Sequence, residues 1–294
     1  MKTVLDKIDI DKFFTIAALV LILTLVGVFI YGFTGWNVLI SLTTWTGITP
    51  TYEIRGFQSY VNIINDPIFA QSFANNIVLL ALFISGSIFI GLILAILLDQ
   101  MERGTGFLRT YFVLPFTLSY VVTGTLWAWM YTPFVGVIDS ILGALRLDFL
   151  KFGWIANPEI SIYCVILTMI WQFSGYTMII IFAGVKSVPF SQIAAAKVDG
   201  AGGFSLYRHI IIPQIKDPLF VAFAVLFAFG VKTFALIWTL TGGGPGFSSY
   251  VLSLLMYRTS FASFLFAEGA GIATIMIMLV LAVIIPYFYF VRRK

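Results

Sequence analysis

The chain has 294 residues, of which 60% are hydrophobic and 10% are charged, and its net charge at pH 7 is +4. A water-soluble domain usually carries about a quarter charged residues, so the composition excludes one and predicts that lipid solvates most of this chain. The basic residues are scattered and form no stripe, so we expect no nucleic-acid partner. With one cysteine, Cys164, and one histidine, His209, we expect no intrachain disulfide, no metal site and no cofactor.

Six stretches are apolar enough to cross a bilayer, which requires about 20 predominantly apolar residues. In chain order they are residues 13–33, 73–98, 107–131, 160–185, 219–240 and 268–291. The first is predicted to be a retained span, not a signal peptide, because the preceding MKTVLDKIDIDK mixes acids with bases and no small-residue cleavage site precedes a soluble domain. The sequence thus predicts an all-α, polytopic membrane protein with six transmembrane helices in a single domain, residues 1–294.

The basic residues are divided unequally between the two sides that six spans define. Twelve lie on the side of the termini, including Arg292, Arg293 and Lys294, and four lie on the opposite side. Cytoplasmic connections carry the excess of Lys and Arg. We therefore expect a protein of the plasma or inner membrane, with both termini and the 186–217 connection in the cytoplasm.

The connections on the opposite side carry three local signals. Asp66-Pro67 marks a turn or a helix start. Residues 132–159 contain GVIDSILGALRL, whose apolar positions recur at helical spacing and predict a short helix on the membrane interface. The run GGGPGFSS at residues 242–249 is poorly tolerated by any helix, so the fifth span is predicted to end there.

The 186–217 connection contains a polar island, AAAKVDGAGGFSLYRHIIIP, at residues 194–213. Pro189 and Ser191 predict a short helix through about Val198, with Ser191 as its N-cap. The glycines of GAGG end that helix, and an apolar stripe then follows at helical spacing. The stripe consists of Phe204, Tyr207, Ile210 and Ile211. The sequence predicts a cytoplasmic helix–turn–helix with a face of small residues and an exposed apolar stripe.

Two other interpretations of the polar island are weaker. A phosphate cradle would require a Lys-Ser or Lys-Thr pair after the glycines, whereas Phe204 follows GAGG, and no strand precedes it. A merely solvated connector would tolerate any polar sequence. The apolar stripe disfavours that interpretation, because exposed apolar patches usually mark partner surfaces.

The polar island resembles a cytoplasmic motif of the inner-membrane permease subunits of binding-protein-dependent ABC importers. That motif reads E-A-A-x-x-x-G, nine residues, then I-x-L-P. Here AAA at 194–196 falls on E-A-A, Gly200 on the glycine, Ile210 on the isoleucine and Ile212-Pro213 on L-P. The sequence DGA at 199–201 matches the Asp-Gly-Ala that is usual in sugar importers.

Three further segments resemble the same family in register. They are GFQSYVNIINDPIFAQSFANNI at 56–77, GVIDSIL in the third outer segment, and LTGGGPGFSSYVL at 240–252. The resemblance extends over nearly the whole chain. It is greatest to the permease subunits of carbohydrate importers of the maltose and glycerol-phosphate type.

The resemblance implies a type I ABC importer permease fold, in which the loop at 190–213 couples the spans to a separate ATPase. The coupling residues that it implies are Ala194, Ala195, Ala196, Asp199, Gly200, Ala201, Phe204, Tyr207 and Arg208. It also implies a loop that faces the binding protein, made of Gly242, Gly243, Gly244 and Pro245. This chain departs from the motif at Ala194, which replaces its glutamate; Gln192 lies two residues earlier and points elsewhere on the helix.

The implied assembly contains several partners. They are a second permease subunit, two ATP-binding subunits, an extracytoplasmic sugar-binding protein, the lipid bilayer and a sugar. A heterodimer of permeases is expected, with a homodimer as the alternative. ATP is hydrolysed by the partner, so this chain is expected to hold no catalytic residue and to be no enzyme.

Two polar residues of the island have simpler interpretations than catalysis. Asp199 is expected to cap the second helix or to pair with Arg208 or Lys197, because no partner for acid catalysis lies near it in sequence. His209 is expected to be an interface or surface residue, not a proton relay.

Polar groups inside spans are costly in lipid and are candidates for function by default. The candidates for the substrate pathway are Lys232, Trp171, Gln172, Tyr176 and Trp238. Their stacking and hydrogen-bonding chemistry suits sugars, but each has an alternative. Lys232 can snorkel or pair with an acid on a neighbouring subunit, and the others can serve as polar contacts between helices. Asn75 and Asn76 are expected to cap or bond the end of the second span, and Glu268 suits the positive end of the sixth.

Two other function classes lack their required residues. A self-contained secondary transporter or channel predicts acidic sites within spans and an internal inverted repeat, and the sequence has neither. A membrane enzyme requires clustered catalytic groups near one face. Asp139 and Asp148, nine residues apart in an outer segment, have no evident partners in the sequence.

Overall fold

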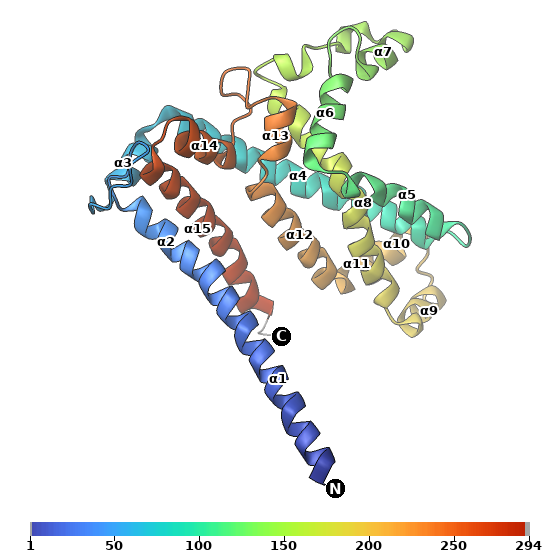
Figure 1. Cartoon of the computed structure of the whole chain (residues 1–294). Helices are drawn as coiled ribbons and strands as arrows, with labels where there is room; N and C mark the ends of the chain where they lie inside the picture. Colours follow the sequence, from blue (N-terminus) through green and yellow to red (C-terminus); the bar gives the residue numbers. More distant parts are fainter. Residues whose placement is uncertain (1, 292–294) are drawn as a thin grey trace. The chain divides into compact units, whose positions relative to one another are not determined.

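The computed structural model describes residues 2–291, and helices make up nearly all of its regular structure (Figure 1). Apolar segments in lipid become helices because each backbone N–H and C=O group then finds a partner within its own segment. Among the described residues, only an isolated bridge between Thr43 and Ile54 has the geometry of paired strands. The all-α prediction is confirmed.

Four described helices are long and apolar enough to cross a membrane, and the number is six if each of two bent helix pairs forms one span. The four are Lys12–Ser41, Pro67–Asp99, Ser161–Ser187 and Phe266–Pro286. The bent pairs are Thr105–Thr117 with Tyr120–Met130 and Gly203–Gln214 with Lys216–Val231. Arg292, Arg293 and Lys294, which contribute to the predicted orientation, lie outside the described residues.

The first and second spans are longer than predicted. Helix α1 (Lys2–Val26), the π-helical turn η1 (Gly27–Gly32) and α2 (Phe33–Ser41) run end to end, so the first span continues past residue 33. Helix α4 (Pro67–Asp99) begins six residues before the predicted 73. Asp66 is its N-cap and accepts a hydrogen bond from the Ile68 backbone N–H, which confirms Asp66-Pro67 as a helix start.

The chain divides into two compact units, each made of two sequence segments. The first is Met1–Asn65 with Met256–Ile275, and the second is Asp66–Leu255 with Met276–Lys294. In the first unit, Asn37 of α2 donates to Ala270 O and Thr274 Oγ1, both at 3.1 Å. Whether residues 1–294 act as a single domain stays a prediction.

The first unit also contains α3 (Gln58–Asn65) and the start of α15 (Phe266–Val291). Asn62 Nδ2 of α3 donates to Glu268 Oε1 at 2.9 Å. Glu268 lies in the first turn of α15, where an acid is favourable, as the sequence predicted. The π-helical turn η5 (Arg258–Ala262) belongs to this unit, and α14 (Leu252–Tyr257) contains the boundary at residues 255 and 256.

The second unit is built around α4 and α8 (Ser161–Ser187), which lie side by side because small residues let their backbones approach. A methyl group on Gly91 of α4 would lie 2.8 Å from Thr177 Cγ2 of α8. One on Gly175 of α8 would overlap the carbonyl oxygen of Phe112 in α5 (Thr105–Thr117). These glycines set the distances between the helices.

The third span was predicted as one helix, residues 107–131, and the single helix is wrong. Helix α5 ends at Thr117, α6 (Tyr120–Met130) begins three residues later, and the two axes differ by 94°. Pro115 lies inside α5 and cannot donate its share of helical hydrogen bonds. Ser119 then caps α6 by accepting from the Val122 N–H, at 3.3 Å.

The fifth span was predicted as one helix, residues 219–240, and this too is wrong. Helix α12 (Lys216–Val231) stops at Val231, and α13 (Ala235–Leu240) begins after a break. Lys232 occupies the break as the C-cap residue of α12, and Ser253 Oγ donates to the backbone carbonyl of Thr233, which is buried. The predicted stop before the glycine run is confirmed, because α13 ends at Leu240.

The predicted short helix of the outer segment is present as α7 (Val137–Ala144), followed by the 3-10 turns η2 (Asp148–Leu150) and η3 (Trp154–Ala156). Asp139 is 2% exposed and accepts from Trp154 Nε1 at 2.6 Å and from the Phe134 backbone N–H at 2.8 Å. Asp148 pairs with Lys151. The expectation that neither acid has a partner is wrong; Asp139 fastens the turn at η3 to α7.

The two N–H donors stabilise the charged form of Asp139 and lower the pKa of its carboxyl below the ordinary 3.8. We predict that Asp139→Asn lowers the free energy of unfolding by about 1.5–3 kcal/mol at pH 7, the range for a hydrogen bond to a charged group. The folded pKa lies below the unfolded one, so this stabilisation is present above about pH 4 and is lost as pH falls through the folded pKa. Thermal unfolding in detergent at several pH values measures both effects.

The matched control is Asp148→Asn, which removes an exposed ion pair worth about 0–1 kcal/mol. An Asp139→Asn protein as stable as the control at pH 7, or a stability difference that does not decrease as pH is lowered from 7 into the acid range, would contradict this assignment.

Candidate functional site

The 186–217 connection folds as a helix–turn–helix, as predicted. Helix α9 (Phe190–Val198) is followed by α10 (Gly203–Leu206), the π-helical turn η4 (Tyr207–Ile211) and α11 (Ile212–Gln214). Gly200 has φ +86° and permits the turn, in which Ala201 N–H donates to Ala196 O at 2.8 Å. Many helices end in this way, with a glycine in the left-handed conformation just after the last helical residues. The predicted N-cap was wrong: Pro189 is the N-cap residue, and Ser191 lies one residue inside α9.

The inner face of this connection is packed onto the helices of the second unit. Tyr207 and Ile211 are 6% and 1% exposed, so the prediction of a fully exposed apolar stripe is wrong for these two residues. The buried cluster around them combines residues of α4, α8 and the connection, namely Ala95, Leu98, Met178, Ile181, Phe182, Val185, Val188, Ala196, Leu206 and Ile215. Burying apolar surface stabilises this contact and makes the connection part of the core of the unit.

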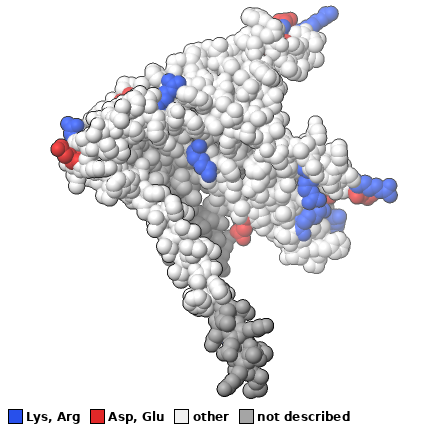
Figure 2. All heavy atoms as spheres, viewed as in Figure 1, with Lys and Arg blue, Asp and Glu red and all other residues white. Residues whose placement is uncertain are grey.

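The outer face is exposed and apolar. Phe190, Val198 and Phe204 are 80%, 88% and 74% exposed. Of the three predicted alanines, Ala195 is exposed, Ala194 is half-buried and Ala196 is buried. Arg208, Asp199 and His209 are exposed, and Lys and Arg side chains gather over this end of the unit (Figure 2). Such an apolar surface with a basic border is typical of a protein docking site.

The polar contacts of the connection differ from those expected. In the described part of the chain, Asp199 has no cation of Arg208 or Lys197 within 4.0 Å. Instead, the Tyr207 hydroxyl donates to Asp99 Oδ2 at 2.7 Å, and Lys186 Nζ lies 2.7 Å from Asp99 Oδ1. Asp99, the last residue of α4, was not predicted from the sequence. The available signal was an acid at the C-terminal end of a helix, where negative charge is unfavourable and requires a partner.

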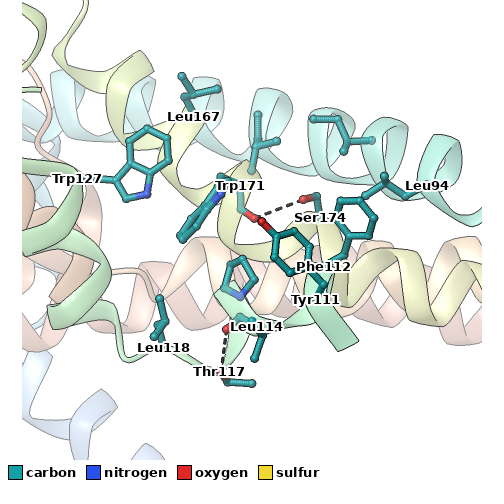
Figure 3. Close-up of a pocket in the computed structure, with 13 residues that line it drawn as sticks. Leu94, Tyr111, Phe112, Leu114, Thr117, Leu118, Trp127, Leu167, Trp171 and Ser174 are labelled. Carbon is teal, nitrogen blue, oxygen red and sulfur yellow. Dashed lines mark hydrogen bonds between the residues drawn. The ribbon is translucent and has the colours of Figure 1, made fainter. Parts of the chain in front are cut away.

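The candidates for the substrate pathway fall into separate groups. Trp171 faces Trp127, with ring centroids 5.5 Å apart, and both line a hollow of about 750 Å³ beside the α5–α6 bend (Figure 3). The walls of this hollow are almost entirely apolar. Ser174 and Thr117 point along it, but their hydroxyls donate to the backbone carbonyls of Trp171 and Leu114. The hollow suits apolar chains better than a sugar.

Tyr176 and Lys232 both adjoin an aromatic cluster made of Phe116, Phe173 and Phe229. The Tyr176 ring stacks on Phe116 at 4.4 Å, and Lys232 Nζ lies 5.1 Å from the Phe229 ring centroid. Phe116 and Phe229 both contact Phe173, with centroids 5.4 and 5.1 Å away. A hydroxyl, a stacked aromatic pair and an exposed ammonium group therefore adjoin the same aromatic cluster.

The remaining two candidates lie elsewhere. Gln172 is 2% exposed, and its Nε2 donates to Leu118 O at 3.0 Å, so it satisfies a carbonyl freed by the α5–α6 bend. Trp238 of α13 is 43% exposed and stacks on Phe234, with centroids 5.8 Å apart. Gln172 therefore serves as a polar contact between α8 and the α5–α6 bend, which is the alternative expected for it.

The outer loop after α13 is held by its own polar groups. Gly242 and Gly243 have φ +62° and +90°, which favour glycine. Thr241 Oγ1 accepts from the Gly243 N–H at 3.1 Å and shares a hydrogen bond with Ser249 Oγ at 2.8 Å. Gly244 O accepts from Ser249 Oγ at 3.0 Å, and Pro245 follows it.

The outer loop is also fastened to α4. Asn75 Nδ2 donates to Ser248 O at 2.9 Å and to Tyr250 O at 2.8 Å, and Asn76 Oδ1 accepts from the Leu252 N–H at 2.9 Å. The prediction that these asparagines cap or bond the end of a span is wrong, because α4 starts well before them. Two adjacent amides in an apolar helix were the available signal, since polar groups there require partners.

The fold defines a class: a multi-pass helical membrane protein with a docked helix–turn–helix on one face and a polar-bonded loop elsewhere. The sequence profile of the binding-protein-dependent transport system inner membrane component matches residues 87–293. The chain belongs to this family, and it is a transport permease component.

Individual relatives agree with this assignment. A probable ABC transporter permease protein of Pyrococcus horikoshii is 50% identical over 279 residues, covering 95% of this chain and 96% of that protein. The xylose/arabinose import permease protein of Haloferax volcanii is 38% identical over 272 residues, covering 92% and 85%. The fold is also that of a chain in a bacterial alginate ABC transporter, solved with a periplasmic protein that holds an alginate pentasaccharide. Its TM-score is 0.82 at 20% identity, with 97% of this chain and 96% of that chain covered.

We predict that Asn75→Leu releases the outer loop, because two carbonyls lose their donors in a buried site. Each lost bond costs about 1–3 kcal/mol. Hydrogen–deuterium exchange of the purified chain in detergent should be faster in residues 243–251, and the melting temperature should fall. The control is Asn65→Leu, which removes an exposed bond within its own helix, to Val61 O. Equal exchange in both variants would refute the tethering role.

Proposed function

We propose that this chain is a membrane-spanning permease subunit of an ATP-driven sugar importer and forms half of its translocation pathway. One observation carries the coupling part of the proposal: the 186–217 connection buries its inner face on α4 and α8 and leaves Phe190, Val198 and Phe204 uncovered. The family membership and the sugar named for the Haloferax relative support the rest.

The exposed face would occupy a groove of a separate ATP-binding subunit. Exposed phenylalanines provide apolar contact area, and the glycine turn at Gly200 holds α9 at a fixed angle. Ala194 leaves only a methyl group where the family motif has an acid, so apolar contact from Phe204 and neighbours carries the docking. Asp199 and Arg208 border it as exposed charges.

The sugar pathway is assigned to the surroundings of the aromatic cluster that Tyr176 and Lys232 adjoin. Stacking on aromatic rings and hydrogen bonds from a hydroxyl and an ammonium group suit a polyol, and the break between α12 and α13 places Lys232 outside a helix. Trp238, one turn into α13, extends this chemistry. A second permease subunit, expected to be a different chain, would supply the facing surface.

Outside the membrane, the loop at 242–245 is proposed to face a sugar-binding protein, with both termini on the cytoplasmic side. ATP hydrolysis is assigned to a partner, which the similarity to other permease proteins supports, and two ATP-binding subunits complete the proposed assembly. Rigid attachment of the loop to α4 by Asn75 and Asn76 favours this role, because a preorganised loop loses little entropy on docking.

The proposal is tested by purifying the tagged chain in mild detergent from its own membranes and identifying every co-eluting protein. We expect a Walker-motif ATPase and a second six-span permease. Phe204→Glu should remove the ATPase and retain the second permease, because it places a charge in an apolar contact.

The matched control is Phe149→Glu, since Phe149 is also 74% exposed but lies in the outer segment, and it should retain the ATPase. A chain that elutes alone and moves solute into liposomes without ATP would overturn the proposal in favour of a secondary transporter or channel.

A further inference from the structure

Asp99 occupies a position that the helix itself does not favour. It is the last residue of α4, where the carbonyl end of the helix carries partial negative charge. Its side chain is only 18% exposed, so water does little to stabilise the carboxylate. A charge in such a place requires protein partners.

The carboxylate has two partners, one for each oxygen. Oδ2 accepts from the Tyr207 hydroxyl of η4, and Oδ1 contacts Lys186 Nζ in the last turn of α8, both at 2.7 Å. Three elements that are distant in sequence therefore meet at one side chain. The Lys186 ammonium also lies 5.4 Å from the Phe182 ring centroid, and that ring faces the Arg109 guanidinium at 5.5 Å.

The two contacts differ in strength. The Lys186 side chain is 56% exposed, so solvent screens its ion pair. Tyr207 is 6% exposed, and its hydroxyl donates to a charged acceptor inside the protein, where hydrogen bonds are stronger. A phenylalanine would fill the same space. The hydroxyl of Tyr207 therefore adds little to packing, and its main effect is to orient the connection relative to Asp99.

We propose that Asp99 is a positioning residue for coupling: its carboxylate fixes the register of the 186–217 connection on the ends of α4 and α8. This inference rests on the proposed function. The apolar contacts of Tyr207 and Ile211 are non-directional and tolerate sliding, whereas the hydrogen bond holds at one register only. A push on α9 then reaches α4 and α8 without slippage.

The first measurement uses the purified chain and needs no partner. Tyr207→Phe and Asp99→Asn should each speed amide exchange in residues 199–215 about tenfold, the change in local opening expected when a hydrogen bond to a charged group is lost. The control is Tyr131→Phe. Tyr131 is 1% exposed and its hydroxyl donates to Cys164 O at 3.2 Å, so this variant loses a buried bond elsewhere.

The second measurement uses the assembled transporter in liposomes and compares substrate imported with ATP hydrolysed. Tyr207→Phe and Asp99→Asn should lower the amount imported per ATP while ATP hydrolysis continues and the ATPase still co-purifies. The double variant should be no worse than Asp99→Asn alone, because both changes remove one shared contact. Tyr131→Phe should leave the ratio unchanged.

The outcomes separate this inference from the proposed function. Unchanged exchange at 199–215 in both variants overturns the positioning role, whatever the transporter does. Faster exchange with an unchanged ratio of import to hydrolysis also overturns it. A wild-type chain that binds no ATPase refutes the proposed function, and a role for Asp99 in coupling falls with it, while faster exchange would still show the carboxylate holding the connection in place.

Discussion

The attachment of the 186–217 connection to the spans depends on the burial of Tyr207 and Ile211 against α4 and α8. Fully burying a large apolar side chain stabilises a fold by about 1.5–3 kcal/mol. Through this contact, a polar segment that would otherwise be a surface loop joins the core around α4 and α8. Its opposite face stays exposed, so the segment has one side attached to the spans and one side free for a partner.

The relative strengths of the contacts explain how the segment is held. Apolar burial supplies most of the stabilisation, and the exposed ion pair of Lys186 adds about 0–1 kcal/mol at most. Neither fixes a register. The register is fixed by the directional hydrogen bond from the Tyr207 hydroxyl to the Asp99 carboxylate, at 2.7 Å. At the outer loop, Asn75 and Asn76 play a comparable part, since amides buried beside a glycine-rich loop hold its carbonyl and N–H groups in place.

Much of the fold follows from local sequence signals. Long apolar runs predicted the helices, Asp66-Pro67 predicted the start of α4, and the glycine runs predicted where two helices end. Gly200 and Gly242 in those runs have positive φ. The bend after Pro115 was missed because total apolar length does not reveal where a span changes direction. The break at Lys232 was missed because its stabilising donor, Ser253, lies in a different helix.

The candidate site could be predicted from the sequence only where its features depend on residues that are near each other in the chain. The helix–turn–helix and its exposed Phe204 were foreseen, but periodicity cannot say which members of an apolar stripe face the spans. Tyr207 lies inward because α4 and α8 offer an apolar surface there, a fact of tertiary packing. Asp99, Asn75 and Asn76 depend on partners roughly 90 or more residues away in sequence, so no spacing rule reaches them.

The most direct test measures a distance within the assembled transporter. Spin labels at Lys197 of α9 and Gln100 just after α4, both exposed, report whether the connection moves with the spans. Buried Cys164 is replaced by alanine so that only these sites are labelled. We expect one distance distribution that is the same with and without a non-hydrolysable ATP analogue, because the Tyr207–Asp99 contact holds the connection on α4. A distribution that shifts or splits when the analogue binds would show that α9 moves independently of α4, and would contradict this expectation.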